Sequence, residues 1–143
     1  MKRTVLFFGF SVATSILVIT GCSKKNDAQS YTVKQLAGTY KLTAATATSG
    51  SATVDMMQFM DDCEKQDLNK LNADSTYEYI TTCNGGNTSE GKWVVKGNLL
   101  ISDPDTYPDT VTIKSFNGST LVFTITETDQ GVTVVNTSTY TKQ

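Results

Sequence analysis

Several segments of the chain alternate apolar and polar residues with a period of two, and this pattern restricts the fold more than any other feature. In residues 121–126, Leu121, Phe123 and Ile125 lie on one face of an extended chain, with Thr124 and Thr126 on the other. Period two is the repeat of a β-strand that buries one face. Further segments of this kind are residues 76–83, 92–96, 110–116 and 132–140, and the count also includes a first segment near 36–45 and a short one at 68–72. The chain is therefore predicted to be all-β.

Short polar turn sequences separate these segments. Gly, Asn, Asp and Ser gather at residues 72–75, 96–98, 116–119 and 128–131, and these residue types favour tight hairpin turns. The segments add up to about eight strands joined mostly by hairpins. An antiparallel meander has two unpaired edges, and closing it into a barrel pairs them. The predicted fold is an antiparallel up-and-down barrel of about eight strands with one short helix.

The short helix is predicted over residues 54–65. Met56, Phe59, Met60 and Cys63 recur at spacings of three and four, which places them on one face of a helix. Two roles for this face are open. Methionine side chains, Met57 among them, are flexible and polarisable and could cover an apolar ligand at the barrel mouth. Packing as ordinary core at one end of the barrel is the commoner outcome for such a face.

The first 22 residues differ in character from the rest of the chain. Lys2 and Arg3 precede an apolar run over residues 5–19, which is too short to cross a bilayer comfortably and is typical of an export signal. The sequence Ile19-Thr20-Gly21-Cys22 resembles the lipobox of bacterial lipoproteins, in which the cysteine is diacylated and the preceding peptide is removed. The resemblance implies a signal peptide at residues 1–21, acylated Cys22 with a polar tether at 22–30, and a folded domain at 31–143.

The implied anchor also carries an address, the cell envelope. Ser23 stands where an aspartate would resemble an inner-membrane retention signal, so the outer membrane is favoured. Residues 24–27 lack the dense acidic cluster that resembles a surface-export signal, so a periplasm-facing position is favoured over the cell surface. Loss of Lys2 and Arg3 lowers the net charge from −2 to about −4. A mildly acidic chain lacks the basic surface that binds nucleic acid, so no nucleic-acid partner is expected.

The chain has three cysteines, and the lipobox resemblance assigns Cys22 to lipid. Cys63 and Cys83 then remain as a pair in an exported, oxidising compartment, where a disulfide is the default. Such a bridge would stabilise the fold by roughly 3 kcal/mol through chain entropy. A metal site or a catalytic thiol is the competing interpretation, which the absence of histidine weakens. We predict a disulfide between Cys63 and Cys83.

Four motifs, in order along the chain, resemble those of the lipocalin-like domain of small bacterial lipoproteins. They are residues 36–42 (LAGTYKL), 62–67 (DCEKQD), 71–77 (LNADSTY) and 91–93 (GKW). In the third motif, Leu71 and Ser75 stand where Phe and Gly are commoner. The resemblance extends over roughly residues 34–141 and implies a small β-barrel with an internal or end-on cavity. It implies no particular ligand, because function belongs to sites rather than to folds.

The favoured hypothesis is a binding module that holds a small apolar or amphipathic molecule in the barrel. The candidate ligand-binding residues are Met56, Phe59, Met60, Tyr77, Tyr79 and Trp93. Two further strand aromatics, Tyr40 and Phe123, could line a cavity, although such residues more often fill the core. The alternative is a structural or interaction lipoprotein with a filled barrel, which would bind an envelope protein through its surface.

Enzymatic function ranks last among these hypotheses. The chain has no histidine, which excludes Ser-His-Asp and Cys-His nucleophilic sites and removes the commonest metal ligand. No cofactor is expected, since no glycine-rich phosphate loop is present. The acidic loop at residues 103–109 could supply oxygens to Ca²⁺, but it holds both prolines of the chain and is better explained as a rigid turn.

Overall fold

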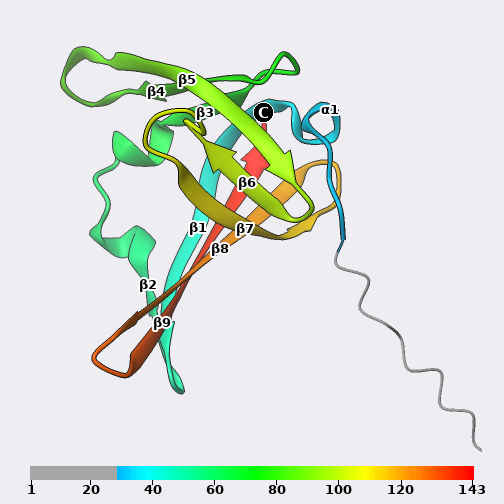
Figure 1. The fold of residues 1–143 in the computed structure, drawn as a ribbon. Helices are drawn as coiled ribbons and strands as arrows, with labels where there is room; N and C mark the ends of the chain where they lie inside the picture. Colours follow the sequence, from blue (N-terminus) through cyan, green and yellow to red (C-terminus); the bar gives the residue numbers. More distant parts are fainter. Residues whose placement is uncertain (1–28) are drawn as a thin grey trace, which may run out of the picture.

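Residues 29–143, which the computed structural model describes, form nine β-strands and one short α-helix, with three 3₁₀ turns between them (Figure 1). The predicted signal peptide, Cys22 and most of the tether lie outside these residues. The elements are α1 (Val33–Leu36), β1 (Gly38–Ser49), β2 (Ala52–Asp55), η1 (Met56–Phe59), η2 (Glu64–Gln66), β3 (Leu68–Leu71), β4 (Thr76–Thr81), η3 (Cys83–Gly85), β5 (Asn87–Lys96), β6 (Leu99–Ser102), β7 (Asp109–Phe116), β8 (Thr120–Asp129) and β9 (Val132–Lys142).

The strands form one antiparallel sheet that closes on itself. Their order is β2-β1-β3-β4-β5-β6-β7-β8-β9, and β9 pairs back onto β1. β1 is long enough to serve three neighbours: residues 38–41 pair with β3, residues 46–49 with β2, and residues 40–48 with β9. β1 and β3 to β9 therefore make a closed eight-stranded barrel, from which β2 extends as a hairpin partner of β1. The predicted antiparallel barrel of about eight strands is confirmed.

Two strands depart from the sequence-based prediction. β5 begins at Asn87, before the predicted residues 92–96, and the four-residue strand β6 lies where no separate segment was predicted. The first half of β5 is polar and exposed, and its backbone pairs with β4 in the register Thr88 with Ile80 and Ser89 with Tyr79. Because backbone pairing rather than apolar burial extends this strand, an alternating apolar pattern is not needed there.

The α-helix predicted over residues 54–65 is wrong. This segment instead completes β2, which pairs Val54 with Ala47 of β1, and continues into the 3₁₀ turns η1 and η2. Strand pairing is possible here because β1 runs on past the end of β3 and leaves an open edge. A short isolated helix is unfavourable because its first turn is costly to form. Pairing with β1 instead supplies backbone hydrogen bonds to this segment.

The predicted disulfide between Cys63 and Cys83 is confirmed. The two Cα atoms lie 5.2 Å apart, and the bridge closes a sequence separation of 20 residues. The bridge joins the connection between β2 and β3 to the end of β4. Beside it, the backbone carbonyl of Cys63 and the carboxylate of Asp67 share the single proton of the Thr82 hydroxyl. The irregular segment that carries η1 and η2 is therefore attached covalently to the barrel wall.

One end of the barrel is closed by α1. Thr32 caps this helix, because its hydroxyl accepts the N–H of Gln35 at 3.3 Å while the Gln35 side chain accepts the N–H of Thr32 at 2.9 Å. Leu36 is fully buried, and its carbonyl accepts the hydroxyl of Tyr40 at 2.8 Å. The buried core at this end consists of Tyr31, Leu36, Tyr40, Trp93, Leu100, Ile113 and Leu121.

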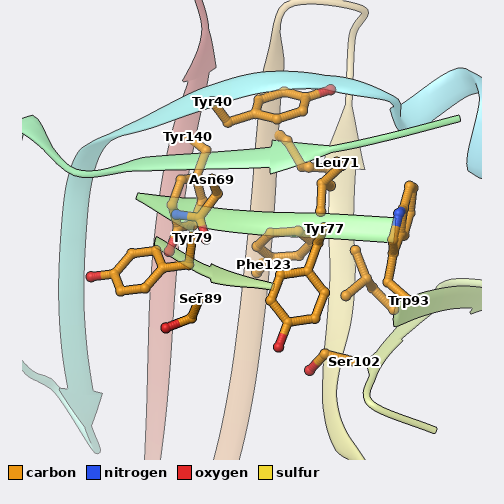
Figure 2. Close-up of a pocket in the computed structure, with 12 residues that line it drawn as sticks. Tyr40, Asn69, Leu71, Tyr77, Tyr79, Ser89, Trp93, Ser102, Phe123 and Tyr140 are labelled. Carbon is orange, nitrogen blue, oxygen red and sulfur yellow. The ribbon is translucent and has the colours of Figure 1, made fainter. Parts of the chain in front are cut away.

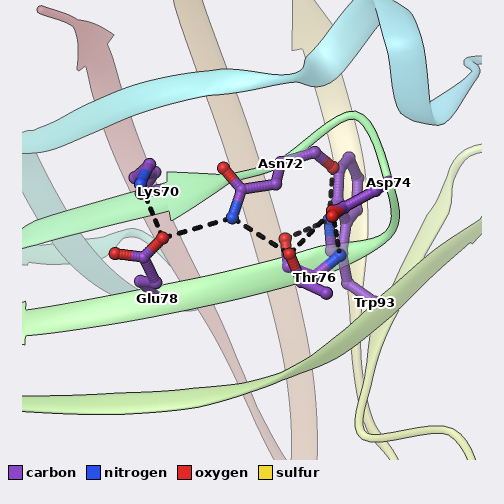
Figure 3. Close-up of polar contacts among 6 residues, drawn as sticks. All are labelled: Lys70, Asn72, Asp74, Thr76, Glu78 and Trp93. Carbon is purple, nitrogen blue, oxygen red and sulfur yellow. Dashed lines mark hydrogen bonds and ion pairs between the residues drawn. The ribbon is translucent and has the colours of Figure 1, made fainter.

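Polar contacts hold the β3–β4 hairpin against β5 (Figure 3). The indole N–H of Trp93 donates to the carbonyls of Asn72 and Thr76 at 3.1 and 3.0 Å. The carboxylate of Asp74 accepts the N–H and the hydroxyl of Thr76 at 3.0 and 2.7 Å. Ser75 has φ of 71°, a conformation that glycine adopts most easily. The hairpin thus fixes the ring of Trp93, which has 0% exposure.

Candidate ligand-binding site

A cavity of about 440 Å³ lies inside the barrel, beside the closed end (Figure 2). Four residues belong both to the core and to the cavity lining and therefore form its floor: Tyr40, Trp93, Leu100 and Leu121. The remaining lining residues are Asn69, Leu71, Tyr77, Tyr79, Ser89, Ser102, Phe123 and Tyr140. The volume falls within the usual range of small-molecule sites, about 300–1,000 Å³.

Two tyrosines of β4 supply one wall. Tyr77 and Tyr79 are two residues apart on a strand, so they share a face, and they lie opposite Gly91 and Ser89 of β5. A Cβ at Gly91 would collide with the ring of Tyr77 and with the carboxylate of Asp103. The missing side chain at Gly91 therefore provides the space for the Tyr77 ring. Tyr79 is 37% exposed, so the cavity reaches solvent on this side.

Each of these tyrosines donates its hydroxyl proton to a carboxylate outside the lining. Tyr77 donates to Asp103 at 2.7 Å, and Tyr79 donates to Asp67 at 2.8 Å. The hydrogen bond to Asp103, with burial adding to it, raises the pKa of Tyr77. Burial, with the hydrogen bond to Asp67 adding to it, raises the pKa of Tyr79 to about 12. Both phenols therefore stay neutral at neutral pH, and their oxygens keep lone pairs that can accept a further hydrogen bond.

Asp67 is the buried acid of the site, with 8% exposure. Besides the Tyr79 hydroxyl, it accepts the N–H of Thr82 at 2.7 Å and the Thr82 hydroxyl at 3.2 Å. Burial acts to raise the pKa of the Asp67 carboxyl, but the hydrogen bonds from Tyr79 and Thr82 outweigh burial and lower it. Asp67 is thus a fixed negative charge close to the disulfide, one hydrogen bond away from the cavity wall.

A pair of aromatic rings forms another wall. Phe123 of β8 and Tyr140 of β9 pack edge to face, with centroids 5.7 Å apart and an interplanar angle of 63°. Burial raises the pKa of the Tyr140 phenol. The same two rings also border a second cavity of about 220 Å³ between β7, β8 and β9. The pair therefore lines both spaces.

Comparison with protein families identifies this barrel. The model of the lipocalin-like domain matches residues 36–123, more than half of the chain. The chain belongs to the lipocalin-like domain family. The matched region contains β1 to β7 and reaches Phe123 in β8, so it includes most of the cavity lining. A search of curated proteins finds no match.

Solved structures that resemble this lipocalin-like domain include two bovine proteins. The bovine lipocalin allergen Bos d 2 matches with a TM-score of 0.43 and 11% identity, over 78% of this chain and 75% of that one. A deswapped triple mutant of bovine odorant-binding protein matches with a TM-score of 0.43 and 13% identity, over 76% of this chain and 74% of that one.

The lipocalin-like domain brings three of the six candidate ligand residues into the cavity lining. These are Tyr77, Tyr79 and Trp93. Met56, Phe59 and Met60 do not line it, and Met56 and Phe59 are 38% and 70% exposed. Neither role considered for their segment, a lid or a core plug, is observed.

Several lining residues were not among the candidates predicted from the sequence. Tyr40 and Phe123, named there only as further strand aromatics, do line the cavity. Leu121 shares the alternating face of Phe123, so periodicity could have included it. Asn69 and Ser89 enter the lining because they lie opposite Tyr79 on the neighbouring strands. Register of this kind is a property of the folded sheet, and no local sequence signal marks it.

The described part of the chain has neither a metal-binding cluster nor a membrane-spanning helix. Residues 29–143 hold no group of three or more His, Cys, Asp or Glu side chains arranged to bind a metal ion. Within the same residues, no helix has both the length and the apolar character needed to span a bilayer. The chemistry available in the cavity is therefore that of neutral aromatic, hydroxyl and amide groups, with Asp67 and Asp103 behind them.

Proposed function

We propose that this lipocalin-like domain binds a small apolar or amphipathic molecule in the cavity of about 440 Å³. The observation that carries the proposal is the lining itself, six of whose twelve residues are aromatic. Aromatic side chains offer large apolar areas, and their burial against a ligand would supply most of the affinity. The hydroxyl and amide groups of Ser89, Asn69 and Tyr140 would orient a polar end. The proposal assigns no catalytic step to these residues.

Binding is testable with a neutral fluorescent probe, N-phenyl-1-naphthylamine, and with native mass spectrometry of protein purified from cells. We expect the probe to bind and Ser102→Phe to abolish binding, because Ser102 lines the cavity and phenylalanine would fill it. Ser115→Phe is the matched control, since Ser115 is exposed on β7 and lies outside the lining. Probe binding that is equally strong in both variants, with no co-purified ligand, would refute a role for the cavity.

We further propose that the domain is anchored to the outer membrane through acyl chains on Cys22, and that it faces the periplasm. The support is the Ile19-Thr20-Gly21-Cys22 sequence, together with Ser23 and the absence of an acidic cluster at residues 24–27. An anchored barrel would work beside a membrane, where apolar molecules are concentrated.

The anchor is tested by feeding cells an alkyne analogue of palmitate. We expect the wild-type protein to be labelled and to fractionate with the outer membrane, and Cys22→Ala to remain unlabelled. Accessibility of the labelled protein to protease added outside intact cells distinguishes the two leaflets. Equal labelling of the Cys22→Ala variant would contradict the proposed acylation site.

A surface-binding lipoprotein is the second candidate function, and one observation favours it. Val54, Met56 and Phe59 are 43%, 38% and 70% exposed on adjacent parts of β2 and η1. Exposed apolar groups that lie together can mark a protein-binding surface. Crosslinking in cells tests this candidate. It requires an envelope protein that crosslinks to wild type but not to a Phe59→Ser variant, whether or not the Ser102→Phe substitution is present.

A further inference from the structure

The cavity combines an aromatic lining with the absence of charged lining groups among the residues that the structure describes. Tyr40, Tyr77, Tyr79, Trp93, Phe123 and Tyr140 contribute rings, and the other lining residues are leucine, serine or asparagine. The face of an aromatic ring carries the negative end of its quadrupole and attracts cations. A ligand inside this space would meet ring faces and neutral polar groups.

Two carboxylates add to this negative character from behind the lining. Asp67 and Asp103 accept the hydroxyl protons of Tyr79 and Tyr77, at 2.8 and 2.7 Å. Since both protons point away from the cavity, the phenol oxygens act toward a ligand as acceptors. A donor group that reaches one of these oxygens would lie about 2.9 Å from it, with the carboxylate immediately beyond. In Figure 2 the hydroxyl of Tyr79 points to the left of the view and that of Tyr77 points downward, toward Ser102.

These carboxylates are held in place by contacts of their own. Asp67 also accepts hydrogen bonds from Thr82, and Asp103 accepts the backbone N–H of Lys92 at 3.3 Å. Their other hydrogen-bond partners are neutral donors. In surroundings of low dielectric constant, such charges act more strongly on a ligand than they would in water.

One cation of the protein already lies against a ring of the lining. The ammonium group of Lys142 is 6.0 Å from the centroid of Tyr40 and donates to the carbonyl of Ala37 at 2.8 Å. This contact is at the end covered by α1, whereas Asp67 and Asp103 neighbour Tyr79 and Tyr77 of β4. The β4 side of the cavity therefore offers acceptors and ring faces without a basic side chain in its lining.

Resting on the proposed function, we infer that the ligand is an organic cation, with an amine or quaternary ammonium group on an apolar body. The charged group would lie near the phenol oxygens of Tyr77 and Tyr79, and the body would pack against Phe123, Tyr140 and Trp93. A carboxylate ligand would instead meet two fixed negative charges with no basic partner in the lining, and this repulsion would exclude it.

The test uses three probes with one naphthalene skeleton: 1-naphthylmethylamine, 1-naphthalenemethanol and 1-naphthoate. Isothermal titration at pH 7 and 150 mM salt measures each affinity for the full-length protein. We expect the ammonium compound to bind about tenfold more tightly than the alcohol, and the carboxylate at least about tenfold more weakly than the alcohol. The moderate salt concentration screens the long-range field of the protein.

Two variants assign the preference to the carboxylates. Asp67→Asn and Asp103→Asn each remove one charge at nearly constant shape and should reduce the preference for the ammonium compound over the alcohol about threefold or more. Asp105→Asn is the matched control, since it makes the same change of net charge at an exposed loop residue. Near-ultraviolet circular dichroism establishes that each variant is folded. If Asp67→Asn does not fold, Asp103→Asn and the wild-type ranking decide alone.

The outcomes separate this inference from the proposed function. If none of the probes binds, N-phenyl-1-naphthylamine included, both are overturned. If the alcohol binds but the ammonium compound binds no better than the carboxylate, the inference is overturned and the proposed function stands. A preference for the ammonium compound that survives in both carboxylate variants also overturns the inference, because the charge preference would then have another origin.

Discussion

At the scale of single residues, Gly91 controls how the cavity wall is built. The ring of Tyr77 and the carboxylate of Asp103 occupy the space that a Cβ at this position would need. The two neighbours are also joined to each other by a hydrogen bond of 2.7 Å. The glycine of the Gly91-Lys92-Trp93 motif therefore serves close packing against the neighbouring strand.

Gly91→Ala is expected to lower the free energy of unfolding by about 1–3 kcal/mol, the usual cost of forcing extra volume into packed surroundings. It should also weaken probe binding, because Tyr77 must shift. Urea unfolding followed by the fluorescence of Trp93 measures the first effect. Thr88→Ala, an exposed position on the same strand, is the control and should change stability by less than about 0.5 kcal/mol. Equal effects of the two substitutions would contradict the packing role of Gly91.

Asp67 makes the free energy of unfolding depend on pH in the acidic range. Its pKa in the folded state is lowered from the ordinary value of 3.8, so its contribution to stability is present above about pH 4 and is lost as the pH falls through the folded-state pKa. Asp67→Asn removes this contribution. We expect the stability difference between wild type and Asp67→Asn to be larger at pH 7 than at pH 2.5, measured by urea unfolding at both values. A difference for Asp67→Asn that is equal at both pH values would contradict the prediction.

At the scale of elements, the segment between β2 and β3 is held to the barrel by one covalent bond and a few hydrogen bonds. It begins with η1, contains Cys63, and ends at Asp67, whose carboxylate accepts from Thr82 and Tyr79. The disulfide and the Asp67 contacts therefore meet at the end of β4, next to the cavity mouth. At this point the disulfide and the hydrogen bonds of Asp67 join the irregular segment to the cavity wall.

Replacement of both Cys63 and Cys83 by alanine should lower the free energy of unfolding by roughly 3 kcal/mol, because the unfolded chain loses a constraint on its loop. The loosened segment should also release Asp67, which would lower the pKa of Tyr79 from about 12 toward its ordinary value of 10.0. An ultraviolet titration of the phenols measures this shift, with Tyr79→Phe identifying the signal. An unchanged phenol titration would show that the disulfide does not support the cavity wall.

The exposed part of the same segment is predicted not to act on the cavity. Phe59 is 70% exposed, whereas Phe123 lines both cavities. Phe59→Ser should change stability by less than about 0.5 kcal/mol and leave probe binding unchanged. Phe123→Ser should cost about 3 kcal/mol or more and abolish binding. If Phe59→Ser weakened probe binding as much as Phe123→Ser, the segment would have to close over the mouth after all.

At the scale of the whole molecule, closure of the barrel couples every strand to the cavity. β1 pairs with β9 along most of its length, and lining residues come from strands at both ends of the chain, Tyr40 on β1 and Tyr140 on β9. A ligand that binds only the closed barrel therefore stabilises the entire fold rather than one wall.

With N-phenyl-1-naphthylamine present at 100 times its Kd, the free energy of unfolding should increase by about 2.7 kcal/mol. Thermal unfolding at several probe concentrations measures this increase through the rise in Tm. The filled-cavity variant Ser102→Phe should show no rise. A rise of equal size in that variant would place the binding site outside the cavity.

Local features of the sequence were sufficient to predict most strands and the closed barrel. The face shared by Leu121, Phe123 and Ile125 predicted β8 because the period of a strand is set by its own backbone. The presence of two cysteines beyond Cys22 predicted the bridge from Cys63 to Cys83. Closure followed because an open meander would leave unpaired edges. The order of the motifs was also sufficient to predict membership of the lipocalin-like family.

Only the tertiary structure decided where the cavity lies and what its surroundings are. The spacing of Met56, Phe59 and Met60 predicted a single helix. The residues before them pair with the open edge of β1 and form β2, so that helix does not form. Strand register, which depends on partners distant in sequence, placed Ser89 opposite Tyr79 and Gly91 opposite Tyr77. The carboxylates of Asp67 and Asp103 reached these tyrosines across 12 and 26 residues of chain. Periodicity is local and can be predicted from the chain, whereas contacts between strands and loops exist only after the sheet has closed.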